Sequence, residues 1–173
     1  VWFDEMICAL LGTAFSTRPG HACYVALPVG FGEGHALTDE VASKLAKADV
    51  LARCKTLLQE ASIMKILRKA KFDLQVLGQR KIKVRPIEDT MLMSYALAAG
   101  QRGHGMDELS ELYLGHKPIS IKELLGTGKS QITFDQVPLE KATPYAAEDA
   151  DITFRLWQMM RPKLVKDRVV SVY

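Results

Sequence analysis

The chain has 173 residues, of which 48% are hydrophobic and 25% are charged, a composition typical of one globular domain that buries a core. Its longest apolar stretches span only a few residues, which excludes a membrane-spanning helix, and no segment is polar enough to predict long disorder. The net charge of +3 combines a basic band, residues 41–86 with 12 Lys/Arg against 3 acidic residues, and an acidic block, residues 87–151 with 5 Lys/Arg against 11 acidic residues.

The first part of the chain predicts a β-hairpin and then helices alternating with strands. Two apolar runs, 7–15 and 22–27, flank Pro19-Gly20, a pair that favours a hairpin turn. N-cap residues, leucine spacing and short apolar runs predict the next elements: a Gly-rich loop at 29–35, a helix from 37–40 to about residue 60, a strand at 62–67 and a helix at 72–79.

The second part of the chain predicts shorter elements followed by one long helix. Caps and glycines set the limits: a strand at 84–87, a helix capped by Asp89 through Ala99, a helix at 106–114 closed by Gly115, a loop with a helical turn at 119–136, and a helix from Thr143-Pro144 to about Met160. This order of elements predicts a mixed α/β domain over residues 1–173.

Several common motifs are excluded by spacing. Three cysteines and four histidines are too scattered for a disulfide framework or a zinc site, which favours buried thiols in a reducing cytoplasm. The run Gly126–Ser130 resembles a phosphate-binding loop, but Glu123 stands where the first glycine of that motif belongs. The chain opens at Val1 with neither an initiator methionine nor a signal peptide, so we expect a piece of a longer protein.

The strongest local pattern is Tyr145-Ala-Ala-Glu148-Asp149. On a helix, Tyr145 and Asp149 share a face, and the alanines leave room beside them. A phenol and a carboxylate presented together favour binding a cation and orienting a water molecule. An exposed acidic helix start that complements the helix dipole is the alternative. The basic band at 41–86 likewise has two interpretations: it is typical either of a polyanion-binding surface or of solvated helix faces.

Blocks over nearly all of the chain, in order and in register, resemble the 3′→5′ proofreading exonuclease domain of bacterial family A DNA polymerases. Residues 133–137 followed by 145–153 resemble its third exonuclease motif, in the tyrosine-x-x-x-aspartate form. Lys71-Phe72-Asp73 resembles the end of its second motif. The other matching blocks are Asp89 to Tyr95, Gly103 to Leu109 and Gly126 to Lys129.

The resemblance implies a ribonuclease H-like mixed sheet flanked by helices, and a site with four carboxylates and two divalent ions, Mg²⁺ or Mn²⁺. One ion helps to generate the attacking hydroxide and the other stabilises the leaving 3′ oxygen. By position, Asp149 would be a direct metal ligand and Asp73 an outer or bridging ligand, while Tyr145 would hold the nucleophilic water. Hard oxygen ligands suit these ions.

The resemblance also implies the partners. A single-stranded DNA 3′ end would lie in a groove beside the basic band, a polymerase domain would follow in the parent chain, and the protein would be a cytoplasmic monomer without membrane contact. The implied DNA-binding residues are Phe3, Lys69, Lys71, His104 and Ile121.

This sequence departs from the family at three places. The first motif, Asp-x-Glu on a strand, would lie before Val1, and the register places Phe3-Asp4 after it, so Asp4 is not expected to be catalytic. Lys69 replaces an asparagine, whose two-sided amide hydrogen bonds lysine cannot copy. Ile121 replaces a base-stacking aromatic residue, which forfeits roughly 1–3 kcal/mol of stacking.

These departures leave two hypotheses. One is an exonuclease domain, of which this chain by itself would have little or no activity. The other is a module whose nuclease site has decayed and which supports a polymerase or holds single-stranded DNA. The Tyr145–Asp149 pair favours the enzyme, whereas Lys69 and Ile121 favour the decayed site. A ribonuclease of the same superfamily fits the blocks at 126–137 less well.

Overall fold

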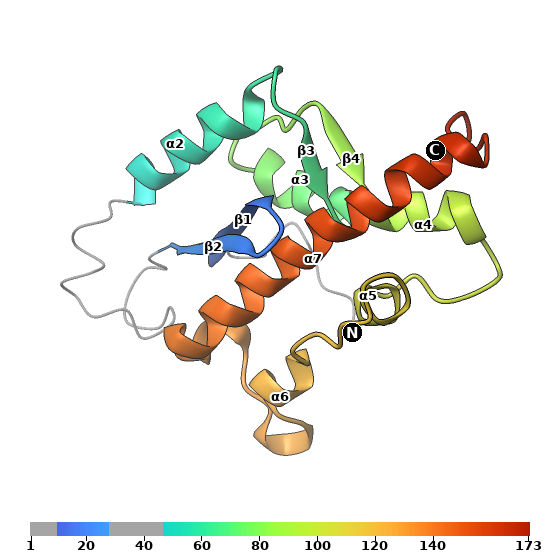
Figure 1. Ribbon diagram of the computed structural model, residues 1–173. Helices are drawn as coiled ribbons and strands as arrows, with labels where there is room; N and C mark the ends of the chain where they lie inside the picture. The colour runs from blue at the N-terminus through green and yellow to red at the C-terminus, as the bar shows by residue number, and fades with distance from the viewer. Residues whose placement is uncertain (1–9, 28–46) are drawn as a thin grey trace.

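The computed structural model describes residues 10–27 and 47–173, which form a mixed α/β structure (Figure 1). Phe3, the expected loop at 29–35 and the expected helix start at 37–40 lie outside the described residues. The described part of that helix, α2, spans Lys47–Gln59. None of the described helices is both long and apolar enough to cross a membrane.

The predicted hairpin is confirmed. Strand β1 (Gly12–Arg18) pairs antiparallel with β2 (His21–Ala26), and Arg18 faces His21 across the Pro19-Gly20 turn. Gly20 has a φ of 74°, a backbone conformation that glycine adopts without steric cost after proline in a tight turn.

The next two strands form a separate parallel pair. Strand β3 (Lys65–Leu67) pairs with β4 (Ile87–Asp89), and α3 (Ala70–Gly78) lies in the crossover between them. We expected one mixed sheet, but in the described ranges the four strands form two two-stranded sheets. Helix α7 (Leu139–Lys166) contacts strands of both sheets.

Strand β3 begins later than the apolar run at 62–67 predicts. The buried Lys65 ammonium donates to three main-chain carbonyls, those of Glu60 (2.5 Å), Ile63 (2.8 Å) and Arg85 (2.6 Å). These bonds hold the residues before Lys65 in a turn, so that only the last part of the run pairs. Strand β4 likewise begins at Ile87 instead of residue 84, after Pro86, which has no N–H to donate.

The expected limits of the last helix are wrong. Helix α7 begins at Leu139 instead of Thr143-Pro144 and continues past Met160 to Lys166. Pro144 lies within the helix, as does Pro162, and both are exposed. Proline removes a helical hydrogen bond, and on the solvent side water can bind the carbonyl that is left free.

The bounds of the remaining helices agree closely with those predicted from the sequence. Asp89 caps α4 (Thr90–Ala98), as predicted, by accepting hydrogen bonds from two main-chain N–H groups of its first turn. Helix α5 (Met106–Leu114) ends at Gly115, which is left-handed with a φ of 61°. The short helix α6 (Ile121–Leu125) and two 3₁₀ turns, Gly128–Ser130 and Phe134–Gln136, lead to α7. Gly126–Ser130 therefore has none of the strand–loop–helix geometry of a phosphate-binding loop.

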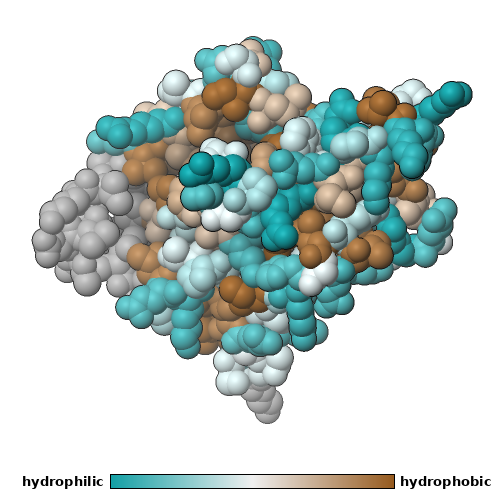
Figure 2. All heavy atoms as spheres, viewed as in Figure 1, coloured by the Kyte–Doolittle hydropathy of each residue, from teal (hydrophilic) through white to brown (hydrophobic). Residues whose placement is uncertain are grey.

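A stripe on α7 organises the main core. Its buried side chains recur every four residues, which places them on one face of the helix against α4 and α5. The members are Met93, Leu109, Ile152, Leu156, Met160 and Leu164. A smaller core lies near α2 and α3 and contains Leu58, Ile82 and Val84. Figure 2 shows that hydrophobic residues on the visible surface occur in small groups between polar ones.

The expectation of buried thiols is wrong for one cysteine. Cys23 is exposed on β2, whereas Cys54 is half-buried, and both are free. Burial raises the pKa of the Cys54 thiol.

Candidate active site

The candidate site lies where the parallel strands end. Arg68 and Lys69 follow β3 directly, and Asp89 is the last residue of β4. Because the carboxyl ends of neighbouring parallel strands meet at one edge of a sheet, these charged groups lie together, in the position where α/β proteins commonly bind ligands. Helix α7 passes close by and contacts β3.

Asp89 organises this edge. Its buried carboxylate accepts hydrogen bonds from the main-chain N–H groups of Lys69 (3.2 Å) and Ala70 (2.7 Å), at the start of α3, and of Met91 (2.8 Å) and Leu92 (3.4 Å), at the start of α4. One side chain therefore joins the first turns of two helices. Both of its oxygens already accept these hydrogen bonds, so the role of Asp89 is structural: it links the two helices.

Tyr145 and Asp149 lie on the buried side of α7. The helix begins at Leu139, so Asp149 is in its third turn, and the interpretation as an exposed acidic helix start is wrong. The two residues continue the stripe that buries Ile152 one turn later. Their side chains are hydrogen-bonded to each other, and the phenol ring also packs against Phe134 at 5.9 Å between centroids.

The environment of Asp149 disfavours its charge. Burial raises the pKa of this carboxyl to about 6, and the charges of Glu148 and Asp107 act in the same direction. The hydrogen bond from Tyr145 and the charge of Arg68 lower it in part. For the Tyr145 hydroxyl, burial and then the Asp149 charge raise the pKa.

Asp73 lies in the first turn of α3. Burial raises the pKa of its carboxyl to about 6, the charge of Asp89 adds to this effect, and Lys69 opposes it. The charged groups that shift the pKa of Asp73 are thus different from those that shift the pKa of Asp149. Arg68 connects the two environments, because the charges of both Asp89 and Asp149 act on its guanidinium. The expected closeness of Asp73 and Asp149 stays a prediction.

Arg68 and Asp107 are the residues that sequence reasoning missed. Arg68 is half-buried, and its Nη2 donates to the carbonyl of His104 at 2.5 Å. Asp107 is in the first turn of α5, and its charge acts on both Arg68 and Asp149. The position of Arg68 directly after a strand was the available signal. Nothing local in the sequence indicates that Asp107 lies beside α7.

The carboxylates of this site meet some of the requirements of a site for a divalent cation. The Oδ1 atom of Asp149 is buried and has no hydrogen-bond partner among the described residues, as suits a carboxylate that binds a hard cation. In the described ranges, however, no three carboxylate, histidine or cysteine side chains come together as a metal site. Asp149 and Asp73 would therefore supply only part of a ligand set.

Of the four predicted DNA-binding residues within the described ranges, Lys69, Lys71 and His104 lie near this edge. Lys69 and Lys71 are exposed at the start of α3, and Lys69 lies 5.9 Å above the Phe72 ring. Lys69 also has a left-handed backbone with a φ of 57°, a conformation that asparagine, the usual family residue, tolerates better than lysine. His104 is half-buried, with Nδ1 2.8 Å from Ser94 Oγ.

Ile121 is held near the site by Glu148. The carboxylate of Glu148 lies 2.8 Å from His116 Nε2 and accepts a hydrogen bond from the Ile119 N–H at 2.6 Å. These contacts fix the segment before α6 against α7. Ile121, the first residue of α6, is exposed, so its side chain is accessible to a base.

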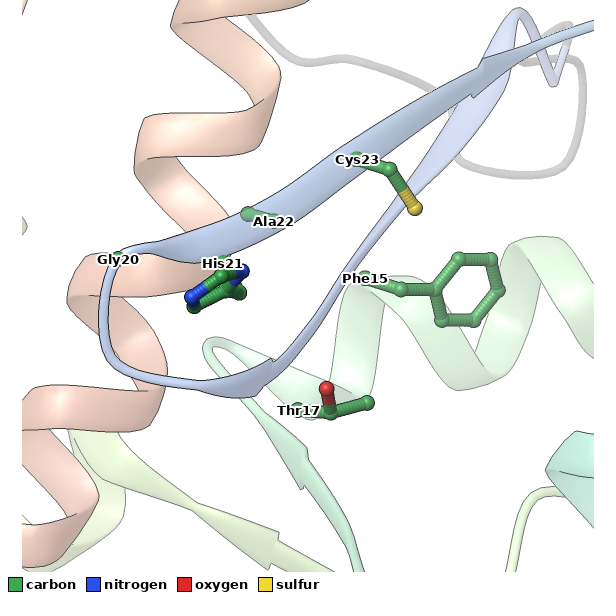
Figure 3. A pocket seen from close by; sticks show the side chains of 6 residues that line it. All are labelled: Phe15, Thr17, Gly20, His21, Ala22 and Cys23. Atoms are coloured by element: carbon green, nitrogen blue, oxygen red, sulfur yellow. The ribbon is translucent and has the colours of Figure 1, made fainter.

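A hollow of about 340 Å³ lies on the β1–β2 hairpin (Figure 3). Phe15 and Thr17 of β1 face the same hollow as His21 and Cys23 of β2. The residues that line it include no carboxylate, so it lacks the groups that make Asp73 and Asp149 candidates for metal binding.

The raised pKa of Asp149 predicts a pH-dependent effect of Asp149→Asn on stability in metal-free solution. Because the fold favours the neutral carboxyl, the stability it contributes is present below about pH 4 and is lost as the pH rises through about 6. The variant and the parent are therefore expected to unfold alike near pH 4, while above pH 6 the variant is more stable by about 1–3 kcal/mol. Urea unfolding in EDTA at several pH values measures this difference. Glu140→Gln, which removes an exposed charge from the same helix, is the control, and a pH-independent difference contradicts the prediction.

The sequence of this chain is similar to those of known proteins of one family. A family model described as 3′-5′ exonuclease, of the DNA polymerase A type, matches residues 15–165. DNA polymerase I of Rhizobium leguminosarum is 44% identical over 153 residues, which are 88% of this chain and 15% of that protein. DNA polymerase I of Pseudomonas aeruginosa is 38% identical over 164 residues, 93% of this chain and 17% of that protein.

A solved structure shows the same fold. The POL domain of Pol1 from M. smegmatis, in complex with DNA primer-template and dNTP, matches with a TM-score of 0.59 and 20% identity, over 87% of this chain and 20% of that chain. This chain thus spans less than a fifth of the curated relatives above. The family match over most of its length shows that the chain belongs to the 3′–5′ exonuclease domain family of the DNA polymerase A type.

Proposed function

We propose that this chain is a ribonuclease H-like domain that removes nucleotides from the 3′ end of single-stranded DNA in a reaction that depends on Mg²⁺ or Mn²⁺. The observation that carries the proposal is the Tyr145–Asp149 pair. A carboxylate held by a phenol, with one buried oxygen that has no partner among the described residues, is costly to keep unless it binds something.

Each residue has a distinct role in this proposal. Asp149 binds a metal ion directly and Asp73 completes or bridges the metal site. The Tyr145 hydroxyl orients the attacking water, and Phe134 packs against its ring to fix that orientation. When bound, the two ions favour formation of the attacking hydroxide and stabilise the leaving 3′ oxygen.

The DNA strand is proposed to lie along the start of α3 and the start of α6. Lys69 and Lys71 place positive charge on the exposed side of α3, where phosphate groups can approach. Ile121 and, outside the described residues, Phe3 provide apolar surface for the terminal bases. His104 borders the same edge through its contacts with Ser94 and Arg68.

The lysines predict the salt dependence of DNA binding. Each neutralised phosphate releases counterions, so Lys69→Ala with Lys71→Ala should weaken binding of all single-stranded sequences alike and flatten the slope of affinity against salt by about 1–2. Fluorescence anisotropy with oligonucleotides of different sequence, from low to moderate salt, measures both quantities. Lys166→Ala at the far end of α7 is the control. An unchanged slope in the double variant places the groove elsewhere.

The names of the relatives suggest in which larger protein this chain works. Both are DNA polymerase I, and this chain corresponds to a minor part of each. We propose that it works in the bacterial cytoplasm as a monomeric unit next to a polymerase domain that lies on its C-terminal side, and that it receives the 3′ end from that domain.

A second candidate is a single-stranded-DNA-binding module with a decayed nuclease site. Two cations favour it: Arg68, on which the charge of Asp149 acts, and Lys69, which replaces the expected asparagine and acts on Asp73. Both candidates predict binding of single-stranded DNA, but only the first predicts chemistry. Release of mononucleotides from a 3′-labelled single strand, with Mg²⁺ and then with EDTA, separates them.

A further inference from the structure

Two cations lie against one aromatic ring where α5 and α7 pack together. The Nζ atom of Lys163, on α7, is 4.3 Å from the centroid of the Tyr113 ring, on α5. The guanidinium carbon of Arg102, in the connection between α4 and α5, is 5.2 Å from the same centroid, and its Nη2 donates to the Tyr113 hydroxyl at 2.5 Å. Because Tyr113 packs against the main core, its ring holds both cations of this Tyr113 cluster in place.

No carboxylate balances these two charges among the residues that the structure describes. Arg155 and Arg161, on the same helix as Lys163, each form an ion pair with a carboxylate, at 3.7 and 2.9 Å. Within the described ranges, Arg102 and Lys163 form none, and Arg102 Nε is buried without a hydrogen-bond partner. The Glu108 carboxylate, at the start of α5, accepts from a main-chain N–H at 3.1 Å instead of pairing with Arg102.

The Tyr113 cluster has the properties of an oxyanion site. The negative face of the ring attracts each cation, but the two cations repel each other. All three side chains are half-buried, so water screens this repulsion less than it does on an open surface. A bound oxyanion would offset the repulsion, and arginine, lysine and hydroxyl donors are the groups that bind phosphate oxygens in proteins.

The place of the cluster in the fold favours a phosphate of DNA. Arg102 lies two residues before His104, so their Cα atoms are at most about 7 Å apart. The His104 carbonyl accepts a hydrogen bond from Arg68 at the end of β3, so this segment leads directly to the edge with the candidate carboxylates. The ring of Tyr95, which is 48% exposed, stacks on the His104 ring at 3.8 Å between centroids. Exposed aromatic rings beside cations are typical of surfaces that bind single-stranded nucleic acid.

We propose that the Tyr113 cluster binds a backbone phosphate of DNA, at a site that shares no residue with the candidate active site. Arg102 and Lys163 supply the positive charge, and Tyr113 fixes their positions. The inference rests on the proposed function, since it takes DNA as the ligand. It extends the path of the DNA from the start of α3, across the connection between α4 and α5, to the C-terminal part of α7. Because the contact is to phosphate, it does not depend on base sequence.

The test is fluorescence anisotropy of the 173-residue chain with a labelled single-stranded oligonucleotide and with its duplex. Arg102→Gln and Lys163→Gln should each weaken binding about threefold to tenfold and flatten the slope of log affinity against log salt by about 0.7, the value for one phosphate of a single strand. Lys163→Arg keeps the charge and should bind like the parent. Lys166→Gln is the matched control, because it removes a lysine one turn further along α7 that contacts no ring in the described part of the chain.

Each outcome supports or overturns the proposal. Weaker binding of the single strand assigns the phosphate to the strand that enters the active site, and weaker binding of the duplex alone assigns it to a duplex beside that site. If Arg102→Gln and Lys163→Gln bind both forms of DNA as Lys166→Gln does, the proposal is wrong. Circular dichroism establishes folding, and since the two cations come from different elements, the variant that folds decides.

The same measurement separates this proposal from the proposed function. If Lys69→Ala with Lys71→Ala leaves DNA binding unchanged while Arg102→Gln and Lys163→Gln weaken it, the proposed path along α3 is wrong and the phosphate site stands. If the lysines of α3 matter and the Tyr113 cluster does not, the phosphate site is wrong and the proposed function stands. A parent chain that binds neither form of DNA overturns both.

Discussion

Asp149→Ala is expected to abolish 3′→5′ cleavage. The substitution removes a direct metal ligand together with the negative charge that retains a dication, so a loss of at least a thousandfold, about 4 kcal/mol of transition-state stabilisation, is expected. The measurement is Mg²⁺-dependent release of mononucleotides from a 3′-labelled single strand. It uses the chain extended at its N-terminus with the Asp-x-Glu strand of a family member, which supplies the remaining carboxylates.

Tyr145→Phe distinguishes ligand loss from loss of orientation in the same assay. The ring still packs against Phe134 and the carboxylate remains, so only the hydroxyl that positions water is lost. A decrease of up to a hundredfold, about 2.7 kcal/mol, is expected. Asp4→Ala is the control, because the sequence register places it outside the first motif. Full activity in Asp149→Ala contradicts the catalytic assignment, and complete loss in Asp4→Ala shows that the register is wrong.

Asp89→Ala should have the largest effect on stability of any single substitution at this edge. It leaves main-chain N–H groups of both α3 and α4 without the carboxylate that they share, and Asp89 is 95% buried, so water replaces it poorly. Loss of a cap typically costs 0.5–2 kcal/mol and an unsatisfied buried group about 1–3 kcal/mol, so a total of about 3–5 kcal/mol is expected. Chemical denaturation followed by circular dichroism measures it.

Two further substitutions test whether the loss of stability in Asp89→Ala comes from capping both α3 and α4. Asp89→Asn keeps one acceptor oxygen and places an amide NH₂ where the other N–H groups donate, so it should lose roughly half as much as Asp89→Ala. Ser120→Ala, at the N-cap of the short helix α6, removes a single exposed cap and should cost under about 1 kcal/mol. If Asp89→Ala and Ser120→Ala lower the free energy of unfolding equally, Asp89 does not stabilise the protein by linking two helices.

The sequence alone determined those features whose causes lie within a few neighbouring residues. Pro19-Gly20 defined the hairpin, Asp89 the start of α4 and Gly115 the end of α5, because turns and caps depend on local backbone geometry and local hydrogen bonds. The family, too, followed from short blocks in register, which the match over residues 15–165 confirms.

The tertiary structure decided what depends on contacts between distant segments. Thr143-Pro144 resembles a helix start, yet packing of the α7 stripe against α4 and α5 outweighs the proline and extends the helix in both directions. Asp149 became a half-buried carboxylate for the same reason. The charge of Asp149 acts on Arg68, 81 positions away in sequence, because the end of strand β3 lies beside α7. Charges that come together from distant parts of the chain have no local sequence pattern, so the sequence predicted the acidic residues of the site without Arg68.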